Sequence, residues 1–196
     1  MNERFQKQLS FILEADKLKN VERQTHITGF TRRENDAEHS WHMAMMLYLL
    51  KEYSNKDFDL AKAMMMALIH DIVEIDAGDT YAYDETALSS QKEREDKACE
   101  RIFGLLPDDQ KETLISLFNE FEKGESAEAR IVKTMDNFQP LLLNDFNNGG
   151  DWKEHVVSKT KVLERHKKSQ LGSEFIGKYS LDMILENVKI GNIKDE

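Results

Sequence analysis

The chain has 196 residues, of which 40% are hydrophobic and 33% charged, a balance typical of a folded protein rather than a disordered one. Its formal net charge of −10 argues against binding nucleic acid or an anionic membrane, because both partners require a basic surface. No apolar run approaches the roughly 20 residues that a membrane-spanning helix needs. The single cysteine, Cys99, cannot form an intramolecular disulfide, so we expect a cytoplasmic protein and a buried, unreactive thiol.

Helix-forming residues dominate the sequence, whereas helix breakers and strand-like alternation are scarce. There are only two prolines and nine glycines, so an all-α fold is predicted. No repeat or flexible linker interrupts the chain, and its length fits one domain, which we expect to span residues 1–196.

Apolar residues at helical spacing predict the helices in chain order. The expected helices are Phe5–Leu18, Ala37–Tyr53, one that carries His70 and Asp71 and continues until Gly78 breaks it, Ser89–Leu105, one opened by Pro107, Ala127–Leu143, Trp152–His166 and Ser173–Val188. The expected N-caps are Asp36, then Asp57 or Asp59, and Ser126. Polar residues over Asn20–Asn35 predict an irregular loop, and the charged run Lys92–Lys97 predicts a solvated helix face.

One stretch, Ala63–Asp79, poses a chemical question. Seven apolar residues lead directly into His70 and Asp71, and Glu74 and Asp79 follow. Burying a lone carboxylate costs several kcal/mol, roughly, unless a base or a metal ion compensates it. The sequence therefore predicts a partner for these acids.

Two further residues suggest what that partner is. His39 lies on the apolar face of its predicted helix, and Asp136 lies among apolar residues of another. Together with His70 and Asp71 they offer nitrogen and oxygen ligands that suit a divalent ion such as Mn, Co, Mg, Ni, Fe or Zn. A single histidine on an apolar face is more often a satisfied core residue, so the conjunction of all four carries the hypothesis.

These residues stand in a pattern that resembles the HD-domain metal-dependent phosphohydrolases, whose signature is H…HD…D. The resemblance is closest to the YfbR-like 5′-deoxynucleotidase and oxetanocin-type branch. It is carried by Arg32–Trp41, Leu68–Thr80 and Ala127–Asp136, within a region from about Leu18 to Leu143. The resemblance implies an HD-domain helical bundle with this core, and we expect C-terminal helices over 151–190 to pack on it.

The resemblance also implies roles for individual residues. His39, His70, Asp71 and Asp136 match the metal ligands. Glu74 matches an acid beside the metal's water, Asp79 matches a second carboxylate at the site, and Arg23 matches an arginine that holds the phosphate. One turn of helix separates His70 from Glu74, so the residues agree with this arrangement; a plain salt bridge from Glu74 to an arginine remains an alternative.

One departure concerns substrate choice. Gln24 follows Arg23 where the nucleotidases have an aromatic residue, which leaves discrimination between ribose and deoxyribose open. Residues that could stack on a base, or else serve in packing, are His26, Trp41, Tyr81 and Tyr83. His42 is expected to support the site rather than to act as a fifth ligand.

The resemblance implies a metal-dependent phosphomonoesterase that acts on a small phosphorylated substrate, a nucleoside 5′-monophosphate. Another HD-domain reaction, on a phosphodiester or a nucleoside triphosphate, is an alternative within enzymes. A non-catalytic regulatory HD module is the alternative outside them, although retention of all four ligands with Glu74 and Asp79 favours an enzyme. Large apolar helix faces also suggest a homodimer, with the terminal helices as candidate contacts.

Overall fold

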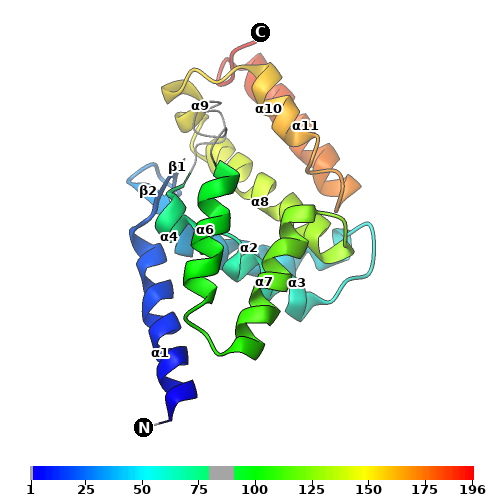
Figure 1. Ribbon diagram of the computed structural model, residues 1–196. Helices are drawn as coiled ribbons and strands as arrows, with labels where there is room; N and C mark the ends of the chain where they lie inside the picture. Colours follow the sequence, from blue (N-terminus) through cyan, green and yellow to red (C-terminus); the bar gives the residue numbers. More distant parts are fainter. Residues whose placement is uncertain (1, 80–90) are drawn as a thin grey trace.

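The computed structural model describes residues 2–79 and 91–196, and the predicted all-α class is confirmed (Figure 1). The described helices are α1 (Glu3–Ala15), α2 (Asp36–Leu50), α3 (Leu60–Ile69), α4 (Glu74–Ala77), α6 (Gln91–Phe103), α7 (Asp108–Lys123), α8 (Ala127–Phe146), α9 (Gly150–Glu154), α10 (Lys159–His166) and α11 (Glu174–Lys189). Two short 3-10 segments, η1 (Asp16–Asn20) and η2 (Lys51–Tyr53), extend α1 and α2.

The predicted loop between the first two helices is instead a β-hairpin. β1 (Glu22–His26) pairs antiparallel with β2 (Arg33–Asn35), so that Glu22 faces Asn35 and His26 faces Arg33. The turn contains Gly29 and Phe30, both at positive φ. The strand residues are almost all polar, so the apolar alternation that marks a half-buried strand is missing. The hairpin matters for function because it carries Arg23.

The core forms where α2, α3 and α8 pack together. Met43 and Leu47 of α2 and Met66 of α3 are completely buried in it, as is Met135 of α8. Capping fixes where these helices begin: Asp59 caps α3 and Ser126 caps α8, as predicted. For α2 the predicted cap is wrong by one residue, because Asn35 caps the helix in a reciprocal capping box with Glu38.

Two other helices differ from expectation at their ends. α1 stops at Ala15, and Phe5, Ile12 and Leu13 are exposed rather than covered by the rest of the chain. The predicted helix over Trp152–His166 is split into α9 and α10 by a turn at Val156, whose φ is +49°. Burial of the next residue, Val157, anchors that turn.

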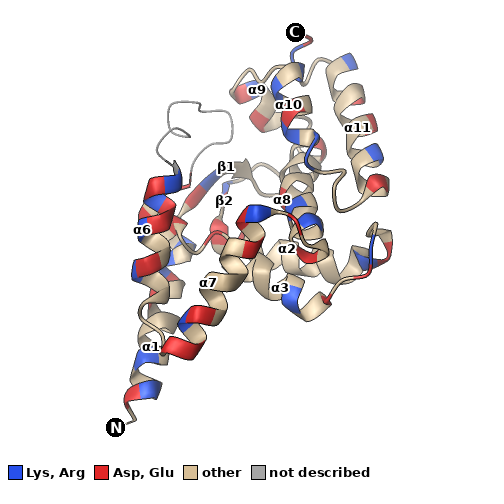
Figure 2. Cartoon of the chain, turned by 45° about the vertical axis from the view of Figure 1, so that its right-hand side comes forward, with Lys and Arg blue, Asp and Glu red and all other residues tan. Residues whose placement is uncertain are grey.

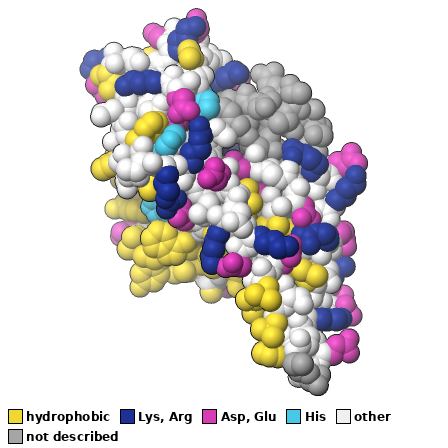
Figure 3. Space-filling view, turned by 90° about the vertical axis from the view of Figure 1, so that its left-hand side faces the viewer, with side chains coloured by type: hydrophobic (Ala, Val, Ile, Leu, Met, Phe, Trp, Pro, Cys, Tyr) yellow, Lys and Arg dark blue, Asp and Glu magenta, His cyan; other side chains and the backbone are white. Residues whose placement is uncertain are grey.

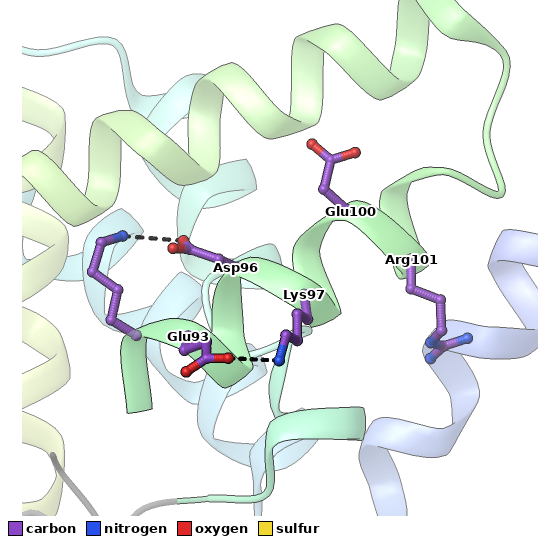
Figure 4. A pocket seen from close by; sticks show the side chains of 6 residues that line it. Glu93, Asp96, Lys97, Glu100 and Arg101 are labelled. Carbon is purple, nitrogen blue, oxygen red and sulfur yellow. Dashed lines mark hydrogen bonds and ion pairs between the residues drawn. The ribbon is translucent and has the colours of Figure 1, made fainter. Parts of the chain in front are cut away.

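The charged run on α6 lies on the surface, as predicted (Figure 2). Lys92 and Lys97 pair with Asp96 and Glu93 one turn away, along a hollow lined by Lys92, Glu93, Asp96, Lys97, Glu100 and Arg101 (Figure 4). None of these six is a predicted site residue. On the inner side of the same helix Cys99 is buried, and burial raises the pKa of its thiol to about 11. Across the described ranges, no helix combines the length and apolarity needed to cross a membrane.

Candidate metal centre

His70 and Asp71 stand at the end of α3 rather than inside a helix that continues to Gly78. The backbone N–H of His70 still bonds to the Met66 carbonyl, as in an α-helix. The chain then tightens, with Ile72 bonding back to Ile69 and Glu74 to Asp71, before α4 begins. The predicted uninterrupted helix is therefore wrong. In this tight turn the side chains of the neighbouring residues His70 and Asp71 both face α2 and α8.

Three separate segments bring the four predicted ligands together (Figure 1). Nε2 of His39, on α2, lies 3.2 Å from Oδ1 of Asp136, on α8, and 4.0 Å from Oδ2 of Asp71. Nε2 of His70 lies 3.1 Å from Oδ1 of Asp71 and 4.0 Å from Oδ1 of Asp136. The two imidazoles are buried, whereas the side chains of Asp71 and Asp136 are 15% and 23% exposed. The cluster therefore opens to solvent on its carboxylate side.

Hydrogen bonds on the far side of each imidazole fix which nitrogen carries the proton. Nδ1 of His70 lies 2.8 Å from the Ala67 carbonyl, to which it can only donate. Nδ1 of His39 lies 3.0 Å from Oε1 of Gln139, whose amide is oriented by its own Nε2 donating to Glu34 at 2.6 Å. Both Nδ1 atoms are thus donors, and both Nε2 lone pairs face the cluster, an arrangement typical of metal-bound histidines.

The inward-facing atoms fit a divalent cation. Nε2 of His70 is buried and has no hydrogen-bond partner in the described part of the chain. Nε2 of His39 faces a carboxylate oxygen of Asp136, although neither atom carries a proton in this tautomer. Two acceptors in that position repel each other unless a cation lies near both. Burial, followed by the charge of Arg23, lowers the pKa of His39 to about 4, so this imidazole is neutral at pH 7, as a metal ligand must be.

Two further acids, Glu74 and Asp79, border the cluster. Burial, reinforced by the charge of Asp71, raises the pKa of Glu74 to about 9, and its Oε2 has no hydrogen-bond partner among the described residues. Asp79 follows Gly78, whose φ of +75° lets the chain turn there. Burial raises the pKa of Asp79, and its Oδ1 lies 3.9 Å from Nη1 of Arg23. The salt bridge considered for Glu74 does not appear among its contacts with the described residues.

Arg23 reaches the cluster from β1 and is held there by acids. Its Nη1 donates to Oδ2 of Asp71 at 2.8 Å and to Oδ1 of Asp36 at 2.9 Å. Nε lies 3.6 Å from Oε2 of Glu34, whereas Nη2 makes no hydrogen bond with the described residues. Although burial opposes it, the charges of Asp71 and Asp36 raise the pKa of Arg23. The arginine therefore lies directly beside one predicted ligand.

Sequence reasoning missed three buried polar residues of this centre. Glu34 and Gln139 orient His39, and Asp36, assigned only as a helix cap, is fully buried against Arg23. Burial, followed by the charge of Asp71, raises the pKa of Asp36 to about 8. Gln139 could have been recognised from the sequence, because it lies three residues after Asp136 and so one turn along the same apolar helix face.

Two of the four residues considered for base stacking, His26 and Trp41, are among the described residues. His26 bonds to Asp151 at 2.6 Å and stacks on Phe30, so it joins the hairpin to α9. Trp41 is 62% exposed on α2. Tyr81 and Tyr83 fall outside the described residues. His42 lies 3.2 Å from Nε2 of Gln139, which agrees with a supporting place behind the ligands.

Comparisons with known proteins give this arrangement a family. Residues 15–175 match the family model described as HD domain. A 5′-deoxynucleotidase HDDC2 from Bos taurus is 33% identical over 140 residues, covering 68% of this chain and 64% of its own length. The human protein of that name is 32% identical over 136 residues, covering 68% and 65%. The chain thus spans about two thirds of the length of these relatives.

A solved structure matches almost the whole chain. The protein from Magnetospirillum magnetotacticum, described as a predicted metal-dependent phosphohydrolase, is 46% identical, with a TM-score of 0.93 over 97% of this chain and 95% of its own. A conserved hypothetical protein from Pyrococcus furiosus is 26% identical, with a TM-score of 0.60 over 92% and 99% of the two chains. The family predicted from the motifs is confirmed: the chain belongs to the HD-domain family.

Proposed function

We propose that the protein is a metal-dependent phosphomonoesterase that hydrolyses nucleoside 5′-monophosphates. The observation that carries this proposal is the set of two Nε2 lone pairs and two carboxylates at the centre, each imidazole fixed from behind by its Nδ1 hydrogen bond. His39, His70, Asp71 and Asp136 would hold one divalent ion, of Mn, Co, Mg, Ni, Fe or Zn. The names of the HDDC2 relatives support the choice of substrate class.

The reaction requires water to displace the nucleoside from phosphorus. A bound divalent ion supplies charge stabilisation at the phosphoryl oxygens and lowers the pKa of water. The water oxygen forms a bond to phosphorus, the bond from phosphorus to the 5′ oxygen breaks, and one water proton ends on that 5′ oxygen. Glu74 and Asp79 are the candidates to move this proton, because the charge of Asp71 acts on both and Oε2 of Glu74 has no partner among the residues that the structure describes.

Arg23 is proposed to contact the substrate phosphate. Its Nη1 is engaged by Asp71 and Asp36, so a phosphate near Asp71 would lie close to the same guanidinium. Nη2 remains available for a phosphoryl oxygen. The pairing also gives Arg23 a second task, which is to fix the orientation of Asp71.

The test measures phosphate release from a panel of nucleoside monophosphates, diesters and triphosphates with added Mn, Co or Mg. We expect release from monophosphates that Asp71→Ala abolishes. Asp182→Ala is the matched control, because Asp182 is exposed on α11 and should leave the rate unchanged. Release only from diesters or triphosphates would favour the alternative HD-domain reactions. No release from any of them would favour a regulatory module and contradict the proposal.

We further propose that residues 1–196 act as one domain. Both α7 and α11 pack against α8, and α10 packs against α11, which links the C-terminal helices to the ligand-bearing helix. Buried hydrogen bonds from Oγ1 of Thr134 to the Ser169 carbonyl, and from the Gly172 N–H to Oγ1 of Thr134, strengthen this junction. A single cooperative unfolding transition is the expected result.

A homodimer is also proposed, with its contact on α2 and α3. These packed helices expose a set of large apolar side chains: Trp41, Met45, Tyr48, Leu49, Met65 and Leu68. Hydrophobic side chains gather into a patch on the face of the molecule that Figure 3 shows. Apolar patches of this kind often mark interfaces. Light scattering should give twice the chain mass, and Leu49→Glu should reduce it to one chain; a wild-type monomer would contradict the proposal.

A further inference from the structure

Arg165 is a cation that the hypothesis built on the motifs leaves unused. It lies in the last turn of α10, half-buried, and its Nε donates to Oδ1 of Asn137 at 3.0 Å. Asn137 follows the predicted ligand Asp136 on α8 and is itself fixed by Nδ2 donating to the Lys133 carbonyl at 2.7 Å. The C-terminal helices thus hold a guanidinium next to the ligand-bearing turn of α8.

The rest of this guanidinium is uncommitted. Five of the other seven arginines have a carboxylate partner in the described structure: Arg4, Arg23, Arg32, Arg33 and Arg101. Arg130, like Arg165, forms no ion pair with the described residues. Arg165 makes no ion pair with any described residue, and its two terminal nitrogens make no hydrogen bond there. A half-buried arginine held by one neutral amide keeps most of its five donors for something else.

Arg165 lies beside the predicted metal centre. Its hydrogen-bond partner, Asn137, directly follows the predicted ligand Asp136 on α8. Among the described residues, Arg165 makes no hydrogen bond or ion pair with Asp136 or Asp79. The guanidinium is therefore held next to the ligand-bearing turn without being bonded to the acids of the centre.

The centre is rich in acids for a site that would receive a phosphate dianion. Arg23, the cation described above, already forms ion pairs with four carboxylates there, those of Glu34, Asp36, Asp71 and Asp79. Two more acids, Glu74 and Asp136, belong to the same centre. We propose that Arg165 binds the substrate's phosphate, with its free nitrogens donating to non-bridging oxygens. A planar guanidinium can engage two such oxygens at once. The proposal rests on the proposed phosphomonoesterase function and gives α10 a part in the active site.

The test compares metal-reconstituted wild type, Arg165→Met and Arg165→Lys, with Lys167→Met as a matched control. Lys167 is an exposed cation that caps the same helix. We expect Arg165→Met to lower kcat/KM by about 10- to 100-fold, as for loss of a charge-assisted hydrogen bond. Arg165→Lys should recover part of this loss because it keeps the charge but not the fork, and Lys167→Met should match wild type.

Two inhibition constants separate phosphate binding from a structural tether. In Arg165→Met the Ki of inorganic phosphate should rise by about the same factor as kcat/KM falls. The Ki of the uncharged nucleoside product, the metal content and the melting temperature should stay unchanged. An equal rise in both constants, or a fall in metal content, would instead make Arg165 a tether between α10 and α8 and overturn the proposal.

Failure of the two proposals can be distinguished. An active wild type with unchanged kcat/KM and phosphate Ki in Arg165→Met overturns the role of Arg165 alone. A wild type that releases no phosphate from nucleoside monophosphates overturns the proposed function. Calorimetric titration of the manganese-loaded proteins with inorganic phosphate then still tests Arg165: weaker binding to Arg165→Met supports it, and equal or absent binding contradicts it.

Discussion

Two parts of the molecule carry dense charge, the outer face of α6 and the interior around Asp71. Their ion pairs have similar lengths: 3.0 Å for Lys92–Asp96 and 2.7 Å for Glu93–Lys97 on α6, against 2.8 Å for Arg23–Asp71 inside. They differ in burial, because the α6 side chains are mostly in water whereas the side chain of Arg23 is 10% exposed. Distance alone therefore does not distinguish a solvated face from a functional centre.

The two regions differ because burial raises the pKa of a carboxylate, whereas exposure to water does not. On α6 the charges of the pairs Lys92–Asp96 and Glu93–Lys97 are screened by water, and each is satisfied by its partner one turn away. In the interior, burial raises the pKa of Asp36 to about 8 and of Glu74 to about 9, each with the charge of Asp71 adding to the rise. Acids in excess of their cations are costly to bury, and a divalent ion offsets that cost.

The largest effect should come from removing a ligand. We expect elemental analysis to find less bound metal in His70→Ala than in the wild type. We also expect phosphate release by this variant to fall to the background rate. Metal at 100 times its Kd should stabilise the wild type by about 2.7 kcal/mol, and this gain should be lost in His70→Ala. Thermal melts with and without added metal measure it. Unchanged metal content in the variant would show that His70 is not a ligand. The buried charges would then differ less in function from the solvated charges of α6.

The inner side of α6 offers the next largest effect. Burial raises the pKa of Cys99 to about 11, against about 8.5 for a free thiol, so less thiolate is present near neutral pH. Alkylation by iodoacetamide at pH 8 should be slower by about two orders of magnitude in the folded protein than in urea, and should accelerate as the pH approaches 11. Equal rates in both states would show that this side of the helix is open to solvent.

A smaller effect should follow from disturbing the support of a ligand. Gln139→Met removes the acceptor for Nδ1 of His39 and leaves the tautomer free to change. Loss of such a support typically weakens metal affinity or activity by about 10- to 100-fold. Gln170→Met is the control, because Gln170 is exposed and contacts His166 instead. Equal metal affinity in the two variants would mean that packing alone orients His39.

Much of the centre could be predicted because its chemistry is local in sequence. The predicted ligands His70 and Asp71 directly follow an apolar run, and Asp136 lies on an apolar helix face. Polar residues in such apolar segments can be recognised from the sequence alone. Helix caps such as Asp59 and Ser126 are equally local, since the capping side chain bonds to a backbone N–H three residues ahead.

What could not be predicted depends on contacts between distant residues. The hairpin of β1 and β2 forms from polar residues whose partners are set by pairing, not by periodicity. The role of Gln139 depends on Glu34, 105 residues away. Arg165 was invisible for the same reason, because only packing of the C-terminal helices brings it to Asn137, 28 residues earlier.

The smallest effect should come from the solvated pairs of α6. Among the described residues, the carboxylate that Glu93→Ala removes bonds only to Lys97 one turn on, and both side chains are 75% exposed. Water replaces the lost contact and salt already screens it, so we expect no measurable change in melting temperature, metal content or phosphate release. The buried ion pair Arg23–Asp71 has a similar length, and we expect Asp71→Ala, which removes its acid, to abolish activity. A measurable loss of metal or activity in Glu93→Ala would mean that the α6 charges reach the centre, and burial would no longer be the property that separates the two regions.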